Sequence, residues 1–170
     1  KQYLDSTYLK TAEQAGLSES ENLTVNQRYI QEAIDEDFKL IMIRPNIVSV
    51  AREMINKAQS KVCVGTVIDF PLGQSSLDHK LKEAQQAIAD GADELDIVVN
   101  LLAIKNSDWQ YLANEINHIM PVAKQKQKTV KLIIESGVLT DDEIIKCCHL
   151  YAPAGIDFLK TSTGYVEKGA

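Results

Sequence analysis

Short apolar runs alternate along this chain with longer stretches in which apolar residues recur every three or four positions. The short runs are mostly continuous rather than alternately apolar and polar, which is typical of parallel strands covered on both faces of a sheet. We predict strands at QYLD (2–5), FKLIMI (38–43), VCVGTVIDF (62–70), ELDIVV (94–99), VKLIIES (130–136) and GIDFLK (155–160). Strict alternation of strands and helices predicts an α/β fold with a parallel sheet, either doubly wound or closed as a (β/α)8 barrel.

Helix ends are marked by recognisable residues. A hydroxyl residue followed three positions later by Glu or Gln predicts a helix start. The predicted caps are Thr24, Ser107, Thr140 and either Ser75 or Ser76. Gly91 and Gly155 each follow a helix and precede a strand, in ADGADELD and APAGIDF. These two junctions resemble each other, so we expect a weak internal repeat.

Composition narrows the class of protein. The chain has 170 residues, 45% hydrophobic and 25% charged, so we expect one globular domain over residues 1–170. A net charge of −6 without a basic block argues against nucleic-acid or membrane binding. Cysteines 63, 147 and 148 suit a reducing cytoplasm rather than a disulfide framework. No histidine or cysteine spacing predicts a metal site, and no GxGxxG or P-loop motif follows a strand.

Ionisable residues interrupt three otherwise apolar strands. Asp96 lies in ELDIVV, Lys131 and Glu135 share one face of VKLIIES, and Lys160 ends GIDFLK. If these strands are neighbours, the four side chains converge on one interior surface. Each charge taken alone is also compatible with a solvated strand face or a structural salt bridge. Ligands bind at the carboxyl ends of parallel strands, which is where Lys160 stands.

A desolvated lysine beside a second cation holds part of its amine neutral, and a neutral amine attacks a carbonyl to form a Schiff base. The iminium then accepts electrons from a breaking carbon–carbon bond. A carboxylate such as that of Asp96 shuttles the proton, directly or through water. The hydroxyls after Lys160 suit polar substrate groups, and Gly164 lets backbone amides approach a phosphate.

The blocks LDSTYLK, VIDFPLG, ADELDIVVN, VKLIIESG with LTDDEI, and FLKTSTG together resemble the deoxyribose-phosphate aldolase family, in order and over nearly the whole chain. The resemblance implies a class I aldolase of the (β/α)8 barrel family, without metal or organic cofactor. It implies reversible cleavage of 2-deoxy-D-ribose 5-phosphate to D-glyceraldehyde 3-phosphate and acetaldehyde.

The resemblance also implies roles for particular residues. Lys160 matches the Schiff-base lysine, Asp96 the aspartate of the proton relay, and Lys131 a lysine that supports it. The residues implied to contact substrate are Asp5, Thr7, Met42, Thr163 near the sugar hydroxyls, and Gly164 at the start of the phosphate site. The implied partners are a phosphorylated sugar and small aldehydes, and barrels of this kind often pair as homodimers.

The chain departs from the family pattern at three places. Met42 and Arg44 stand in MIRP where the family often has Cys-x-Tyr-Pro, and Tyr165 follows Gly164 where some members have a basic residue. The sequence stops just past the sixth strand, about two β–α units before the family does. We therefore expect a portion of a longer gene product, and little turnover from these 170 residues alone.

Two other functions stay open. Another Schiff-base lyase, acting on a related phosphorylated sugar or a keto acid, would use the same lysine. Alternatively, a truncated barrel is a binding or assembly module without catalysis, in which Lys160 is an ordinary lysine at a strand end.

Overall fold

The computed structural model describes residues 3–166. The strands are β1 (Asp5–Tyr8), β2 (Leu40–Ile43), β3 (Cys63–Ile68), β4 (Glu94–Val98), β5 (Thr129–Ile133) and β6 (Phe158–Lys160). The helices are α1 (Ala12–Ala15), α2 (Glu19–Asp35), α3 (Val48–Lys57), α4 (Leu77–Ala89), α5 (Leu101–Lys105), α6 (Trp109–Gln125) and α7 (Asp141–Tyr151), with short 3-10 turns at Pro45–Ile47 and Ser136–Val138.

The strands form one sheet in the order β1-β2-β3-β4-β5-β6, which is also their order along the chain. The pairs β1–β2, β2–β3 and β5–β6 are parallel. A doubly wound sheet reverses its strand order at a switch point, whereas a (β/α)8 barrel adds each strand next to the previous one. The observed order is therefore that of the barrel family and decides between the two folds left open by the sequence pattern.

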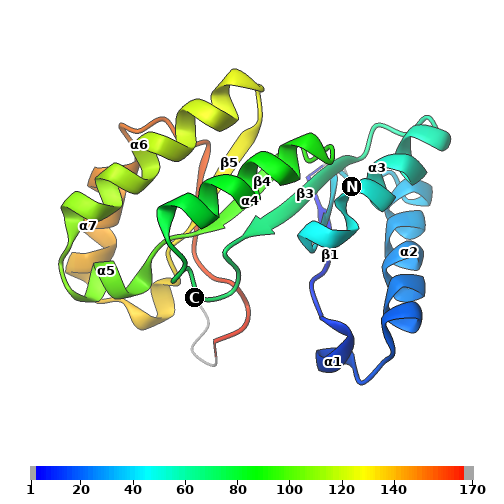
Figure 1. Ribbon diagram of the computed structural model, residues 1–170, viewed down its shortest axis with the longest axis horizontal. Helices are drawn as coiled ribbons and strands as arrows, with labels where there is room; N and C mark the ends of the chain where they lie inside the picture. The colour runs from blue at the N-terminus through cyan, green and yellow to red at the C-terminus, as the bar shows by residue number, and fades with distance from the viewer. Residues whose placement is uncertain (1–2, 167–170) are drawn as a thin grey trace. The chain divides into compact units, whose positions relative to one another are not determined.

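The chain forms two compact units. The first contains the residues up to Thr66 together with Ala89–Glu94, and the second contains Val67–Ile88 and the residues from Leu95 onward. Strands β3 and β4 cross this division, so the single domain expected from the sequence stays a prediction. Within the first unit α2 packs along α3, and within the second α6 packs against α5 and α7 (Figure 1).

All six predicted strands exist, although most are shorter than predicted. Strands β2 and β4 are buried along their whole length, as their continuous apolar runs indicated. The first strand is displaced: it begins at Asp5, where the predicted QYLD segment ends, and part of that segment lies outside the described residues. Exposed Tyr3 and Leu4 precede it, so the apolar residues of QYLD do not form the strand.

The caps were predicted with mixed success. Thr140 forms the expected capping box with Glu143, and Ser76 accepts the His79 amide at the start of α4. Thr24 was wrong as a cap, because α2 begins earlier, after a capping box made by Ser18 and Glu21. The Thr24 hydroxyl instead donates to the carbonyl of Ser20 one turn back.

The cap predicted for α6 was displaced by one residue. Asp108, not Ser107, accepts the Tyr111 amide and begins this helix. Ser107 lies before it with a positive φ of 57°, a conformation that does not suit an N-cap.

The predicted internal repeat is present as a pair of matching hydrogen-bond patterns. Asp93 donates its amide to Val64 O at 2.7 Å and accepts the Val64 amide on its carboxylate at 3.0 Å. Asp157 does the same with Val130, at 3.0 and 2.8 Å. In each case the aspartate follows the small-residue turn and binds the beginning of the preceding strand. The repeat therefore fixes how β4 starts beside β3 and how β6 starts beside β5.

Candidate active site

Lys160 is the last residue of β6, opposite Ile133 of β5, with Phe158 opposite Lys131. Lys160 and Phe158 are two positions apart on a strand and so share a face. The Lys160 Nζ donates to Asp96 Oδ2 at 2.7 Å, and the lysine side chain is 38% exposed. The amine is thus held by a carboxylate and is still accessible to a small molecule.

Asp96 lies on β4 and is completely buried. Its second oxygen, Oδ1, has no hydrogen-bond partner among the described residues, and the Lys131 Nζ lies 3.8 Å from it. Lys131 is 14% exposed, and its Nζ lies 6.0 Å from the centre of the Phe158 ring. One carboxylate therefore stands between two ammonium groups, one at hydrogen-bond distance and one slightly farther away.

The two lysines compensate the charge of Asp96. A buried carboxylate costs free energy unless cations or donors compensate it, and here two lysines do so. Two cations around one anion leave a net positive charge on this cluster.

The segment that follows Lys160 is held by the end of β5. The Lys160 carbonyl accepts the Ile134 amide at 3.0 Å, and the Thr161 carbonyl accepts the Ser136 amide at 2.7 Å. Between them, the Glu135 carboxylate accepts the Thr163 amide at 3.1 Å and the Thr163 hydroxyl in a short hydrogen bond. Three consecutive residues thus bind the backbone or side chains of the segment that begins at the lysine.

Glu135 does not converge with the three other charged strand residues. Its φ of 52° turns the chain out of the extended conformation just after β5, and the side chain bonds Thr163. The alternation of a strand therefore stops before this residue, which is why the face assigned from the sequence is wrong here. The Thr163 hydroxyl donates its proton to Glu135 and accepts the Tyr165 amide at 3.1 Å, and its contact with a substrate hydroxyl stays a prediction.

Gly164 has a φ of +80°, and a Cβ added there meets nothing within 4 Å, so backbone conformation rather than space favours glycine. Tyr165 packs edge-on against Phe70, with ring centres 5.0 Å apart. Phe70 lies in the loop after β3, although the predicted strand extended to it, and its contact with Tyr165 joins that loop to the segment following Lys160.

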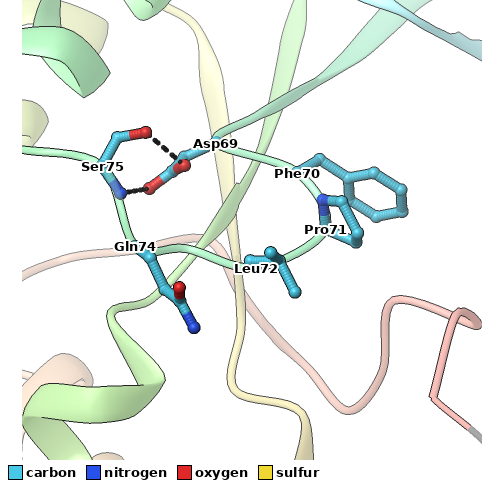
Figure 2. Close-up of a pocket in the computed structure, with 6 residues that line it drawn as sticks. All are labelled: Asp69, Phe70, Pro71, Leu72, Gln74 and Ser75. Carbon is cyan, nitrogen blue, oxygen red and sulfur yellow. Dashed lines mark hydrogen bonds between the residues drawn. The ribbon is translucent and has the colours of Figure 1, made fainter.

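The loop after β3 forms a pocket of about 270 Å³, lined by Asp69, Phe70, Pro71, Leu72, Gln74 and Ser75 (Figure 2). Figure 2 shows Asp69 and Ser75 facing each other across the loop, where the carboxylate accepts the Ser75 amide at 2.9 Å and its hydroxyl at 2.8 Å. At Gly73 the loop lies close to the backbone of Val99, because a Cβ on residue 73 would lie 2.0 Å from the Val99 carbonyl oxygen.

A buried ionic cluster, made by Lys80, Asp69 and Glu115, supports this loop. Lys80 is completely buried, and its Nζ lies 2.9 Å from Glu115 Oε1 and 3.4 Å from Asp69 Oδ2. It also donates to the Val98 carbonyl at 2.9 Å. Burial raises the pKa of the Glu115 carboxyl, and the Lys80 charge opposes part of that rise. Sequence reasoning missed this cluster, although Lys80 is in helical register with buried Ala84 and Ala87.

The structure thus brings Asp96, Lys131 and Lys160 together and places Thr163 and Gly164 next in the chain. Asp5 and Thr7 are exposed on β1 of the first unit, and their contact with substrate stays a prediction. Met42 is buried on β2 opposite Gly65, and a Cβ on that glycine would lie 2.6 Å from the methionine Cε. Met42 therefore fills the space that Gly65 leaves, and its role toward substrate also stays a prediction.

Two further properties concern ligands and surroundings. Within residues 3–166, no His, Cys, Asp and Glu side chains gather in a group of three or more that could hold a metal ion. In the same range, no helix combines the length and apolar character needed to cross a membrane.

Comparison with known proteins identifies the family. A sequence model of the DeoC/LacD family aldolases matches residues 9–170. The chain belongs to the DeoC/LacD aldolase family. It is 43% identical over 139 residues to the deoxyribose-phosphate aldolase of Thermococcus gammatolerans, covering 82% of this chain and 62% of that protein. To the Lactococcus lactis deoxyribose-phosphate aldolase it is 43% identical over 144 residues, with 85% and 64% covered.

Solved structures of this DeoC/LacD group agree with the fold. The aldolase QR15 superposes with a TM-score of 0.86 at 33% identity, covering 99% of this chain and 70% of that one. The deoxyribose phosphate aldolase from Aeropyrum pernix, described as tetrameric, superposes with a TM-score of 0.80 at 30% identity, covering 96% and 64%. The expected fold class is confirmed, and the chain spans 62% of the length of the Thermococcus relative.

Proposed function

We propose that this chain carries the Schiff-base centre of a deoxyribose-phosphate aldolase, with Lys160 as the nucleophile. The observation that supports it most directly is the buried Asp96 between Lys160 and Lys131, at 2.7 and 3.8 Å. The proposed substrate for cleavage is 2-deoxy-D-ribose 5-phosphate, a deoxyribose phosphate as in the names of the relatives. The proposed substrates of the reverse reaction are D-glyceraldehyde 3-phosphate and acetaldehyde, as the family resemblance implies.

In the cleavage direction, the Lys160 amine attacks the aldehyde carbon of the open-chain sugar phosphate, and loss of water gives an iminium. The hydroxyl on the third carbon gives its proton to Asp96, directly or through water, and the bond between the second and third carbons breaks. The electron pair moves into the iminium to form an enamine, and glyceraldehyde 3-phosphate leaves. Protonation of the enamine and hydrolysis release acetaldehyde and regenerate the amine.

Lys131 supports this sequence electrostatically. Its ammonium group lies 3.8 Å from Asp96 Oδ1 and helps to compensate the buried carboxylate that accepts the substrate proton. The steps proposed above use no metal and no organic cofactor. The unpaired thiols Cys63, Cys147 and Cys148 are compatible with a cytoplasmic location, which we include in the proposal. Self-association, such as the predicted homodimer, is testable by light scattering.

The test is chemical trapping in the complete gene product. Incubation with acetaldehyde and borohydride should leave an N-ethyl group on Lys160, mapped by peptide mass spectrometry. Lys160→Arg keeps a cation but forms no imine, and it should abolish the adduct, whereas Lys82→Arg on the exposed face of α4 should not. A folded protein that forms no adduct at Lys160 would exclude the Schiff-base role and favour the non-catalytic binding module.

Trapping alone does not identify the substrate. Cleavage of 2-deoxyribose 5-phosphate should therefore be compared with cleavage of phosphorylated keto-acid aldols by the same protein. A preference for a keto donor over acetaldehyde would assign the chain to another Schiff-base lyase. Asp96→Asn should retain the adduct on Lys160 but lose about 10²–10⁴-fold in cleavage rate, because it removes the proton acceptor.

A further inference from the structure

Glu135 is a buried carboxylate that the proposed reaction does not use. It is 1% exposed, and no ion pair joins it to a cation among residues 3–166. In that range the carboxylate accepts hydrogen bonds only from the Thr163 amide and hydroxyl. A buried charge is costly unless it is compensated, and here two donors from a single residue compensate it.

The backbone of Glu135 is also unusual. A φ of 52° and ψ of 57° place it in the left-handed region, which glycine, asparagine and aspartate occupy far more readily than glutamate. Gly137 stands two residues later in the same turn, so the chain places a glutamate, not a nearby glycine, at the left-handed position. Other non-glycine residues, such as Gln59 and Gln127, have a similar φ, so the conformation matters here because of the contacts that accompany it.

The neighbours of Glu135 explain what the conformation achieves. Ile134 binds the Lys160 carbonyl and Ser136 binds the Thr161 carbonyl, so Glu135 is the middle of three successive contacts to one segment. Strand β6 ends at Lys160, and after the Thr161 contact no further backbone bond to the chain following β5 is seen for Ser162 or Thr163 among residues 3–166. The Glu135 carboxylate holds this part of the segment, because it accepts hydrogen bonds from the Thr163 amide and hydroxyl.

We propose that Glu135 is a positioning residue, which fixes the segment Lys160–Thr163 and thereby keeps the Lys160 amine on Asp96. This rests on the proposed function, because the consequence of positioning is a faster reaction at Lys160. The Lys160 side chain is 38% exposed, so surrounding atoms alone do not confine it. Its direction depends on the Asp96 contact and on the backbone that Glu135 holds.

The first measurement is hydrogen exchange in the complete gene product. In Glu135→Ala, the amides of Thr163 and Ile134 should lose protection by about tenfold to hundredfold, the effect of losing a hydrogen bond to a charged group. The Val99 amide, which binds Ile133 O within the sheet, should keep its protection. Equal loss at Val99 would show general destabilisation and overturn the positioning role.

The second measurement is the rate of imine trapping at Lys160 by acetaldehyde and borohydride, per folded molecule. Glu135→Ala should lower it at least tenfold, and Glu135→Gln, which keeps an acceptor oxygen, should lower it less. If Glu135→Ala does not fold, Thr163→Val tests the same bond, and Thr163→Ser should recover most of the lost rate. The matched control is Glu143→Gln, a partly exposed capping carboxylate on α7, which should leave the rate within about twofold.

The two measurements separate the two proposals. If the wild-type protein traps no aldehyde, the proposed function fails, and hydrogen exchange alone then decides whether Glu135 fixes the segment. If Thr163 loses protection while the trapping rate stays at the wild-type value, Glu135 holds the segment without positioning Lys160, and the inference is wrong.

Discussion

Replacing Lys80 with methionine tests how the loop after β3 is held. The substitution keeps the length and most of the volume of the side chain but removes the cation that contacts both Asp69 and Glu115. Asp69 retains its two hydrogen bonds from Ser75. Glu115 loses its ion pair, and the carbonyl of Val98 loses a donor. Most of the cost therefore falls on Glu115, which is only 4% exposed.

Breaking a buried ion pair by removing one partner costs about 3–5 kcal/mol, because the other charge is left uncompensated. Lys80 is completely buried, so solvent does not screen these contacts. For a chain of this size, 1 kcal/mol corresponds to roughly 2–4 °C in melting temperature. We therefore expect the Lys80→Met variant to melt roughly 6–20 °C lower.

The measurements at pH 7 are thermal melting and urea unfolding, both followed by far-ultraviolet circular dichroism. Lys82→Met is the matched control, because Lys82 is on the same helix but is 73% exposed in an i,i+4 pair with Asp78. It should cost no more than about 0.5 kcal/mol. Adding Glu115→Gln to Lys80→Met should recover part of the loss, since it removes the uncompensated charge. A loss for Lys80→Met no larger than that for Lys82→Met would refute the reasoning.

Three further predictions concern pH, thiols and glycine. Burial raises the pKa of the Glu115 carboxyl above its ordinary 4.5. Above pH 4.5 the folded chain therefore holds more of this proton than the unfolded chain, so the free energy of unfolding should fall as the pH rises. Urea titrations from pH 4.5 upward should show this fall for the wild type relative to Glu115→Gln. Burial raises the pKa of Cys147 to about 11. A disulfide reagent at pH 8 should therefore react rapidly with exposed Cys148 but not with Cys147 in the native protein. Cys148→Ser should remove this rapid reaction. Gly73→Ala should lower the free energy of unfolding in urea by at least about 2 kcal/mol more than Gly16→Ala does. Both glycines have a φ of +67°, but only a Cβ at residue 73 would meet a carbonyl oxygen. Equal losses of stability would show that this contact has no effect.

The sequence predicted those parts of the fold that depend on local pattern. Continuous apolar runs located the strands, and the unusual charges within them identified Asp96, Lys131 and Lys160 as a group. This worked because the alternation of a strand is a strong geometric constraint once the order of strands is known. The barrel-type order itself came from the structure and from the family resemblance, since periodicity does not distinguish it from a doubly wound sheet.

The features that sequence reasoning missed depend on contacts between distant residues. Lys80 is on a buried helix face, but its two carboxylates come from the end of β3 and from α6. Glu135 was assigned to the lysine face because a single residue with a positive φ is invisible to a pattern of period two. The cap of α2 was misplaced because two successive motifs both fit, and only packing selects Ser18.

The paired bonds of Asp157 with Val130 have a consequence for errors in folding. Side chains on a strand alternate, so a slip of one residue between β5 and β6 would turn Lys160 to the opposite face, away from Asp96. Asp157 stands three residues before Lys160, and its carboxylate and amide bind the same partner residue. A slipped strand would lose both bonds at once. The wrong register is therefore disfavoured at the start of β6, three residues before the lysine. Asp93 gives the same protection to β4, which carries the carboxylate of the pair. The strand that carries Lys160 and the strand that carries Asp96 each have their register fixed by an aspartate that takes no part in the Lys160–Asp96 contact.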